Sequence, residues 1–81
     1  IYFIRNEDIY KIGITDNLLR RFNQLRPHEI LNVVRCSNYE ILEQELLKKF
    51  KNNRIPQTEY FRLNKYQIEQ VHNEMMKGAE F

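Results

Sequence analysis

Glu43 is a carboxylate on the apolar side of a predicted helix, where a charged group is least expected. On a helical wheel of about 100° per residue, Glu43 falls inside one continuous apolar arc, whereas Glu40 lies at its rim and Glu45 on the opposite side. The arc consists of Tyr39, Leu42, Leu46, Leu47 and Phe50. Because an ionised carboxylate among apolar side chains is costly unless it is paired or binds a metal, Glu43 is a candidate metal ligand. A buried ion pair with Arg21 or Arg35 is the alternative.

Tyr2, Lys11 and Gly13 are candidates for one face of a β-hairpin. Side chains alternate between the two faces of a strand, and a two-residue turn at Asn6-Glu7 would place Tyr2 opposite Lys11. Any loop of even length keeps Tyr2 on the face of Lys11 and Gly13, whereas a three-residue loop separates them. A glycine inside a strand often marks the close approach of a ligand or another backbone. The alternatives are an ordinary half-buried tyrosine beside an exposed lysine, and a β-bulge at Gly13.

Basic side chains supply candidate contacts to phosphate. Arg21 sits at the edge of an apolar helix face, beside Leu25, whereas Arg20 points away from that face. Edge placement suits an arginine that stretches over a sheet to a phosphate, although a surface arginine with a buried stem fits as well. Further along the chain, a basic run could contact backbone phosphates or simply form a solvated helix end. That run consists of Lys48, Lys49, Lys51 and Arg54.

The elements that must position these side chains follow from the spacing of the apolar residues. Two strands are predicted at 1–5 and 9–15, joined by a turn at 6–8, because β-branched and aromatic residues dominate both segments. Thr15 or Asp16 can cap the helix that follows, and Pro27 ends it. The apolar face of this helix consists of Leu18, Leu19, Phe22 and Leu25. Residues 29–36 then form a third strand.

The second half of the chain is predicted to be mostly helical. Ser37 or Asn38 caps a helix that runs to about Lys51, residues 60–63 form a short extended piece, and Asn64 caps the last helix. His72 lies on the apolar stripe of that helix and is expected to be packed. The predicted order is β-β-α-β-α-(β)-α, an α/β chain of the α+β kind with a small, mainly antiparallel three-stranded sheet flanked by helices. Residues 1–77 are expected to form a single domain and 78–81 a tail.

Composition sets wider limits. The 81 residues suffice for one domain with a thin core, so an open surface groove is the expected working site. A net charge of +2, from 13 basic and 11 acidic residues, is too small to prove a nucleic-acid partner. Cys36 is the only cysteine, which excludes an intrachain disulfide and fits a reducing compartment. Because no apolar run reaches the ~20 residues that span a bilayer and no signal peptide is present, we expect an intracellular protein, cytoplasmic or nuclear, without a membrane partner.

Taken in order, the candidate residues resemble the motifs of the GIY-YIG nuclease superfamily. The likeness runs through Tyr2 in Ile-Tyr-Phe-Ile, Lys11 and Gly13 in Tyr-Lys-Ile-Gly-Ile-Thr, Arg21 in Leu-Leu-Arg-Arg-Phe-Asn-Gln-Leu, and Glu43 in Leu-Glu-Gln-Glu-Leu-Leu-Lys-Lys-Phe. It covers about residues 1–63 and is nearest to a branch common in phages and large DNA viruses, where the second motif often reads Lys-Ile-Gly. In that branch the domain sequence ends with an acidic-aromatic signature. This signature makes Glu59 an additional acidic candidate. Here the signature is Thr58-Glu59-Tyr60-Phe61-Arg62-Leu63.

The resemblance implies a metal-dependent endonuclease domain that hydrolyses DNA phosphodiester bonds with Mg²⁺ or Mn²⁺. By position, Tyr2 matches the first-motif tyrosine, Gly13 the second-motif glycine, Arg21 the catalytic arginine and Glu43 the metal ligand. Tyr2 would deprotonate or orient the attacking water, and Lys11 would be the cation that a phenol with a pKa of about 10 needs to act as a base. Arg21 would neutralise charge in the transition state. Glu43 would hold the metal that stabilises the leaving 3′-oxygen.

Three departures from the family keep other interpretations open. The first-motif glycine would precede Ile1, Lys11 stands in the second-motif tyrosine position, and Leu47 stands where the branch often has histidine. They leave undecided whether Tyr2 or Lys11 is the general base. Two rivals follow: a catalytically inactive GIY-YIG-like module that only binds DNA, and an unrelated small α/β interaction domain.

The chain is also expected to be part of a larger assembly. It begins without methionine, as a piece of a longer protein would. We expect DNA as the partner, with specificity supplied by a DNA-recognition domain elsewhere in the full-length chain or by a homodimer. Within the domain, we expect Tyr2, Lys11, Arg21 and Glu43 to converge on one face of the sheet.

Overall fold

The fold is a three-stranded antiparallel sheet with three α-helices, seen in a computed structural model that describes residues 1–80. The elements in chain order are β1 (Tyr2–Asn6), β2 (Ile9–Gly13), α1 (Leu18–Leu25), β3 (Glu29–Val33), α2 (Tyr39–Lys49), the short 3-10 helix η1 (Lys51–Asn53) and α3 (Lys65–Lys77). The strand order in the sheet is β2-β1-β3. The predicted α+β class is therefore confirmed.

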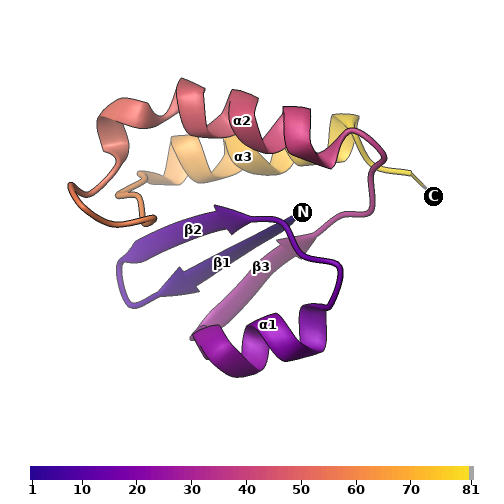
Figure 1. The fold of residues 1–81 in the computed structure, drawn as a ribbon. Helices are drawn as coiled ribbons and strands as arrows, with labels where there is room; N and C mark the ends of the chain where they lie inside the picture. Colours follow the sequence, from indigo (N-terminus) through magenta and orange to yellow (C-terminus); the bar gives the residue numbers. More distant parts are fainter. Residues whose placement is uncertain (81) are drawn as a thin grey trace.

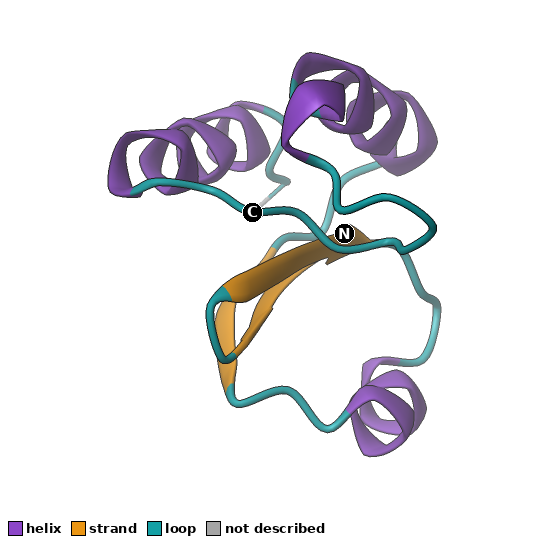
Figure 2. Ribbon diagram, turned by 90° about the vertical axis from the view of Figure 1, so that its left-hand side faces the viewer, coloured by secondary structure: helices purple, strands orange, loops and turns teal. Residues whose placement is uncertain are grey.

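The helices divide unequally between the two faces of the sheet. Helices α2 and α3 lie side by side over one face, and α1 lies alone against the other (Figures 1 and 2). The core between the sheet and the α2–α3 layer contains Phe3, Ile12, Leu46, Phe50, Phe61, Val71 and Met75. His72 packs there as predicted, with its ring edge-on to Phe3 at a centroid distance of 5.3 Å. Among residues 1–80, no helix is both long and apolar enough to span a membrane.

Helix α1 is held more lightly than its apolar pattern predicts. None of its residues is buried, and Leu19, assigned to the apolar face, is 75% exposed. The contact that anchors α1 is made by Phe22, whose ring meets that of Tyr2 edge-on at a centroid distance of 5.5 Å. The prediction for Leu19 was wrong because the sheet is only three strands wide, which leaves no surface for a broad helix face to cover.

The hairpin has the predicted parity but a different register. Its two-residue turn is Glu7-Asp8, one residue later than predicted, so Tyr2 pairs with Gly13 rather than with Lys11. Glu7 adopts a positive φ of 55°, as two-residue hairpin turns require. The backbone N–H of Glu7 donates to Nδ1 of His28 over 2.8 Å, which ties the turn to the loop before β3. Since the loop is even in length, Tyr2, Lys11 and Gly13 share a face.

Several element ends differ from the prediction. Asn17, and neither Thr15 nor Asp16, caps α1, because its side chain accepts a 3.0 Å hydrogen bond from the Arg20 N–H. Strands β2 and β3 end at Gly13 and Val33, and α2 ends at Lys49 before the η1 turn. Asn64 caps α3 as predicted, in a capping box with Gln67.

The extended piece at 60–63 is one bridge to the edge of the sheet and no full strand. Phe61 and Tyr10 exchange backbone hydrogen bonds of 2.9 and 2.7 Å. This contact covers the outer edge of β2 and places the neighbouring Glu59 and Tyr60 beside it. Within the predicted tail, Glu80 contacts the domain, because its N–H donates to the Arg35 carbonyl oxygen over 2.8 Å; Phe81 lies outside the described residues.

Candidate active site

Gly13 is required by the ring of Tyr2. A Cβ atom built on Gly13 would overlap the hydroxyl oxygen and Cζ of Tyr2, and would lie 2.8 Å from Cε2. Because the β1–β2 register is regular at this pair, the β-bulge alternative for Gly13 does not apply. The close approach that the glycine permits is thus that of the cross-strand tyrosine. Gly13 sets the position of the Tyr2 hydroxyl.

Tyr2 is buried except at its hydroxyl group. The residue is 1% exposed, and its hydroxyl makes no hydrogen bond within residues 1–80. No buried side-chain oxygen or nitrogen in that range lacks a partner, so the hydroxyl must touch solvent. Burial raises the pKa of the phenol, opposed mainly by the positive charge of Arg21, while Glu59 and Glu43 raise it further. The Tyr2 hydroxyl therefore keeps its proton at neutral pH.

Lys11 points from the same face of the sheet into an ion pair. Its Nζ donates to Oε2 of Glu59 over 2.6 Å, and it lies 5.9 Å from the centre of the Tyr60 ring. The hydrogen bond and the charge of Lys11 hold the pKa of Glu59 below its ordinary value. Lys11 is buried, which contradicts the alternative of an exposed lysine. The cation that acts most strongly on Tyr2 is Arg21, and this corrects the helper role expected of Lys11.

Glu43 stands partly buried on α2 without a partner. Its carboxylate makes no ion pair or hydrogen bond with any of residues 1–80, so the alternative of a structural ion pair with Arg21 or Arg35 is not formed. Burial raises the pKa of Glu43, the charge of Lys11 lowers it, and Glu59 raises it. The sequence thus predicts a carboxylate inside an apolar helix face, and in the structure this carboxylate has no ion-pair partner within residues 1–80.

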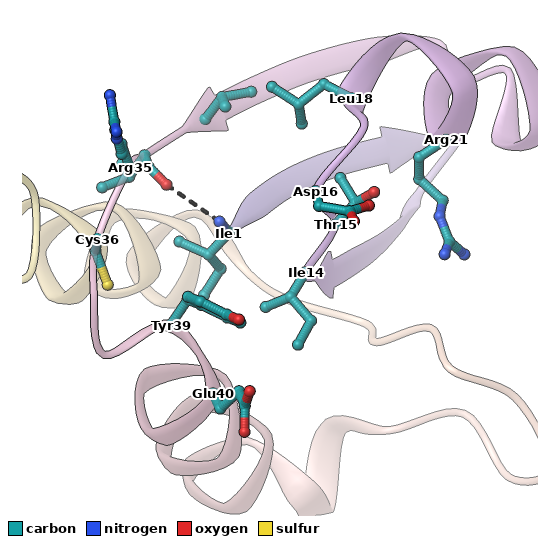
Figure 3. A pocket seen from close by; sticks show the side chains of 12 residues that line it. Ile1, Ile14, Thr15, Asp16, Leu18, Arg21, Arg35, Cys36, Tyr39 and Glu40 are labelled. Carbon is teal, nitrogen blue, oxygen red and sulfur yellow. Dashed lines mark hydrogen bonds between the residues drawn. The ribbon is translucent and has the colours of Figure 1, made fainter.

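Arg21 of α1 completes the group. Its guanidinium makes no ion pair or side-chain hydrogen bond within residues 1–80, and its side chain is partly buried, whereas Arg20 is exposed. Arg21 lies at one end of a hollow of about 790 Å³, with Arg35 at the other end (Figure 3). The hollow is lined between them by apolar side chains that include Ile1, Ile14, Leu18, Val34 and Tyr39. Tyr2, Lys11 and Glu43 are not among the residues that line this hollow.

The four principal candidates do not all lie on one face of the sheet. Tyr2 and Lys11 share the α1 face, and Arg21 comes from α1, but Glu43 comes from α2 on the opposite face (Figure 1). The prediction of a single face was therefore wrong for Glu43. A cavity of about 240 Å³ beside the edge strand β2 brings Glu43 of α2 together with Lys11. That cavity is lined by Lys11, Ile12, Glu43, Leu47, Lys51, Arg54, Glu59 and Phe61.

Comparison with known families supports a link to nucleic-acid chemistry. Residues 1–76 match the T5orf172 domain. The chain belongs to the T5orf172 domain family. This domain is associated with nuclease-like proteins of phages and bacteria. Comparison with curated proteins gave no match, and neither did comparison with solved structures.

The T5orf172 match contains the whole candidate site. It begins before Tyr2 and ends after Glu59, so every side chain that lines the β2-edge cavity lies inside it. The predicted basic run, in contrast, is divided. Lys51 and Arg54 line this cavity, whereas the exposed Lys49 lines a separate hollow with Tyr66 on α3, and Lys48 is exposed at the helix surface.

Sequence reasoning missed one residue of the site. Tyr60 stacks near the Lys11 ammonium and contributes to the raised pKa of Tyr2. Its position inside the acidic-aromatic signature was the available signal. That signature drew attention to Glu59 alone, although the ring of the neighbouring Tyr60 also lies near the Lys11 ammonium.

The donors of the site suit one class of metal. Among residues 1–80, no three His, Cys, Asp or Glu side chains gather into a metal-binding group. Structural and catalytic zinc sites need three or four protein ligands. Mg²⁺ keeps several waters and is commonly held by one or two carboxylates together with substrate phosphates. The unpaired Glu43 carboxylate, at the mouth of an open cavity, fits Mg²⁺ or Mn²⁺ bound in this way.

Proposed function

We propose that this T5orf172 domain is a metal-dependent endonuclease domain that hydrolyses DNA phosphodiester bonds in the manner of the GIY-YIG nucleases. The observation that carries the proposal is Glu43, a partly buried carboxylate that has a raised pKa and makes no ion pair or hydrogen bond with any of residues 1–80. Its charge acts on the Tyr2 hydroxyl, whose pKa it raises and the charge of Arg21 lowers. Such clustering of perturbed titratable groups is typical of functional sites.

Each side chain has a role that its surroundings support. Tyr2, whose hydroxyl keeps its proton at neutral pH, orients the attacking water by hydrogen bonding, and the proton that this water loses on attack passes to solvent. Arg21 faces the accumulating negative charge of the phosphoryl group, because its guanidinium is not engaged by any carboxylate of residues 1–80. Glu43 holds Mg²⁺ or Mn²⁺, which when bound supplies charge stabilisation to the leaving oxygen. Lys51 and Arg54 bind the flanking backbone phosphates.

The proposal is tested by nicking of supercoiled plasmid DNA in Mg²⁺, in Mn²⁺ and with a chelator. Wild-type protein is expected to convert the plasmid to open circles only when the metal is present. Glu43→Gln should not nick, whereas Glu45→Gln, which removes the same charge from the outer side of α2, should nick normally. Equal nicking by wild type and Glu43→Gln would contradict the proposal.

A second candidate is a T5orf172 module that binds DNA without cutting it. The burial of Tyr2 and its raised pKa favour this alternative, because a protonated phenol is a poor base. Such a module would shift the mobility of DNA with and without metal, and Arg21→Ala would weaken that binding. It would not nick in Mg²⁺ or Mn²⁺ even at alkaline pH, where a tyrosine base becomes competent. The same plasmid assay over a range of pH therefore separates the two candidates.

A further inference from the structure

Lys11 and Glu59 form an ion pair whose partners differ in exposure. The Nζ and Oε2 atoms are 2.6 Å apart, yet the lysine side chain is 8% exposed and the glutamate side chain 77%. A buried ammonium that loses its counter-charge is strongly unfavourable, whereas an exposed carboxylate that leaves such a pair is simply hydrated. Lys11 therefore requires an anion, but that anion need not be Glu59.

The cavity beside this pair contains further cationic groups. Three of its lining side chains are basic, namely Lys11, Lys51 and Arg54. Nε of Arg54 donates to the Thr58 carbonyl oxygen over 2.7 Å, which fixes the guanidinium beside the segment that carries Glu59. The two terminal nitrogens of Arg54 have no partner within residues 1–80. The charges of Arg54 and Arg21 add to that of Lys11 in lowering the pKa of Glu59.

We propose that the Glu59 carboxylate occupies a subsite for a backbone phosphate, and that nucleic acid binds there by displacing Glu59 from Lys11. A phosphate offers negative charge and several acceptor oxygens, so it can accept from Lys11 and from the free nitrogens of Arg54 together. Glu59 then keeps the buried lysine compensated between substrates and lowers the affinity of the site for other anions. This inference rests on the proposed function, since it takes nucleic acid as the ligand.

The test measures the binding of a short fluorescent DNA duplex by fluorescence anisotropy. The buffer contains a chelator, so that cleavage does not interfere. Glu59→Gln should lower the dissociation constant about tenfold, because the phosphate no longer competes with an internal anion. Glu45→Gln removes an equal charge on the outer side of α2, and it should change the constant by less than about twofold. In a Lys11→Met background, Glu59→Gln should gain no more than Glu45→Gln does. Circular dichroism confirms that each variant is folded.

The other outcomes count against the displacement. Weaker binding by Glu59→Gln would mean that Glu59 itself contacts the ligand or holds Lys11 in place for it. Equal gains from Glu59→Gln and Glu45→Gln would mean that only the overall charge matters. If wild type binds the duplex and Glu59→Gln gains nothing over the control, the displacement fails and the proposed function stands. If neither wild type nor Glu59→Gln binds, both fail.

Discussion

The two faces of the sheet differ in how completely they are packed. Under α2 and α3, the side chains of Phe3, Leu46, Val71 and Met75 are almost completely buried. On the other face, α1 contributes no buried residue and is held through Phe22 on Tyr2. Because stability follows mainly from buried apolar area, most of it must come from the α2–α3 side. The α1 side is left free to carry a phenol, an ammonium and a guanidinium.

The largest effect is expected from removing a ring on the packed face. Phe3→Ala should lower the free energy of unfolding by about 3–5 kcal/mol, since it leaves a cavity among rigid neighbours. Phe22→Ala on α1 should cost only about 1–2 kcal/mol, because a partly exposed ring contributes little more than its aromatic pair. Urea denaturation measures both.

The nicking rate should be more sensitive to Phe22→Ala than the free energy of unfolding is. Phe22→Ala removes the ring that supports Tyr2, so its nicking rate should fall although the domain stays folded. A loss of stability from Phe22→Ala as large as that from Phe3→Ala would show that the two faces share the packing equally. The division between a stabilising face and a chemical face would then be untenable.

The next effect compares two neighbouring arginines of the lightly held helix. Arg21→Ala should lower the nicking rate about 10²- to 10³-fold, as is usual when one positioned donor to a transition state is removed. Arg20→Ala should leave the rate nearly unchanged, because Arg20 is exposed whereas Arg21 is partly buried. Similar losses from both would indicate general attraction for phosphate rather than a positioned contact.

A smaller effect should distinguish the two glycines. Gly13→Ala forces a Cβ into the Tyr2 ring, and overpacking of this kind costs about 1–3 kcal/mol. Gly78→Ala is the matched control, since its Cβ would meet the flexible end of Leu42 at 3.3 Å. The cost at Gly13 should disappear when Tyr2→Ala is added, because the colliding ring is then gone. An unrescued loss in the double variant would trace the cost to the strand backbone instead.

Much of this molecule was predictable from local patterns. The elements, the parity of the hairpin and the inward position of Glu43 each depend on residues close together in the sequence, and all three are found in the structure. The Asn64 cap was predictable for the same reason. The exposure of Leu19 was not predictable from the sequence of α1, because it depends on the width of the sheet.

The predictions that failed concern contacts between distant segments. The turn lies one residue later than predicted, and His28, from the loop before β3, accepts a hydrogen bond from the Glu7 N–H there. The pairing of Lys11 with Glu59 joins positions 48 residues apart, so no local pattern indicates it. Glu43 was expected on the face of Tyr2 because a helical wheel shows which side of a helix is buried. It does not show which face of the sheet that helix covers.

The smallest expected effect compares the two carboxylates that flank Lys11, whose pKa values move in opposite directions. Burial raises the pKa of Glu43 above its ordinary 4.5, so the folded protein holds this proton more tightly than the unfolded chain does. Ionisation then opposes folding, and wild type loses stability as the pH rises from 4.5 through the higher folded value. Glu43→Gln cannot ionise. Without metal it should match wild type in acid and melt slightly higher at neutral pH.

Glu59→Gln should show the opposite sign. The pKa of Glu59 is lowered by Lys11, so its ionised form contributes stability above pH 4.5 that is lost as the pH falls through the lower folded value. This variant should melt lower than wild type at neutral pH, because the buried Lys11 loses its counter-charge, and it should converge with wild type in strong acid. Added Mg²⁺ should raise the melting temperature of wild type but not of Glu43→Gln, because only a ligand of the folded state produces that shift. A large loss of metal-free stability in Glu43→Gln, with nicking retained, would mean that Glu43 holds the fold together and has no part in binding a metal.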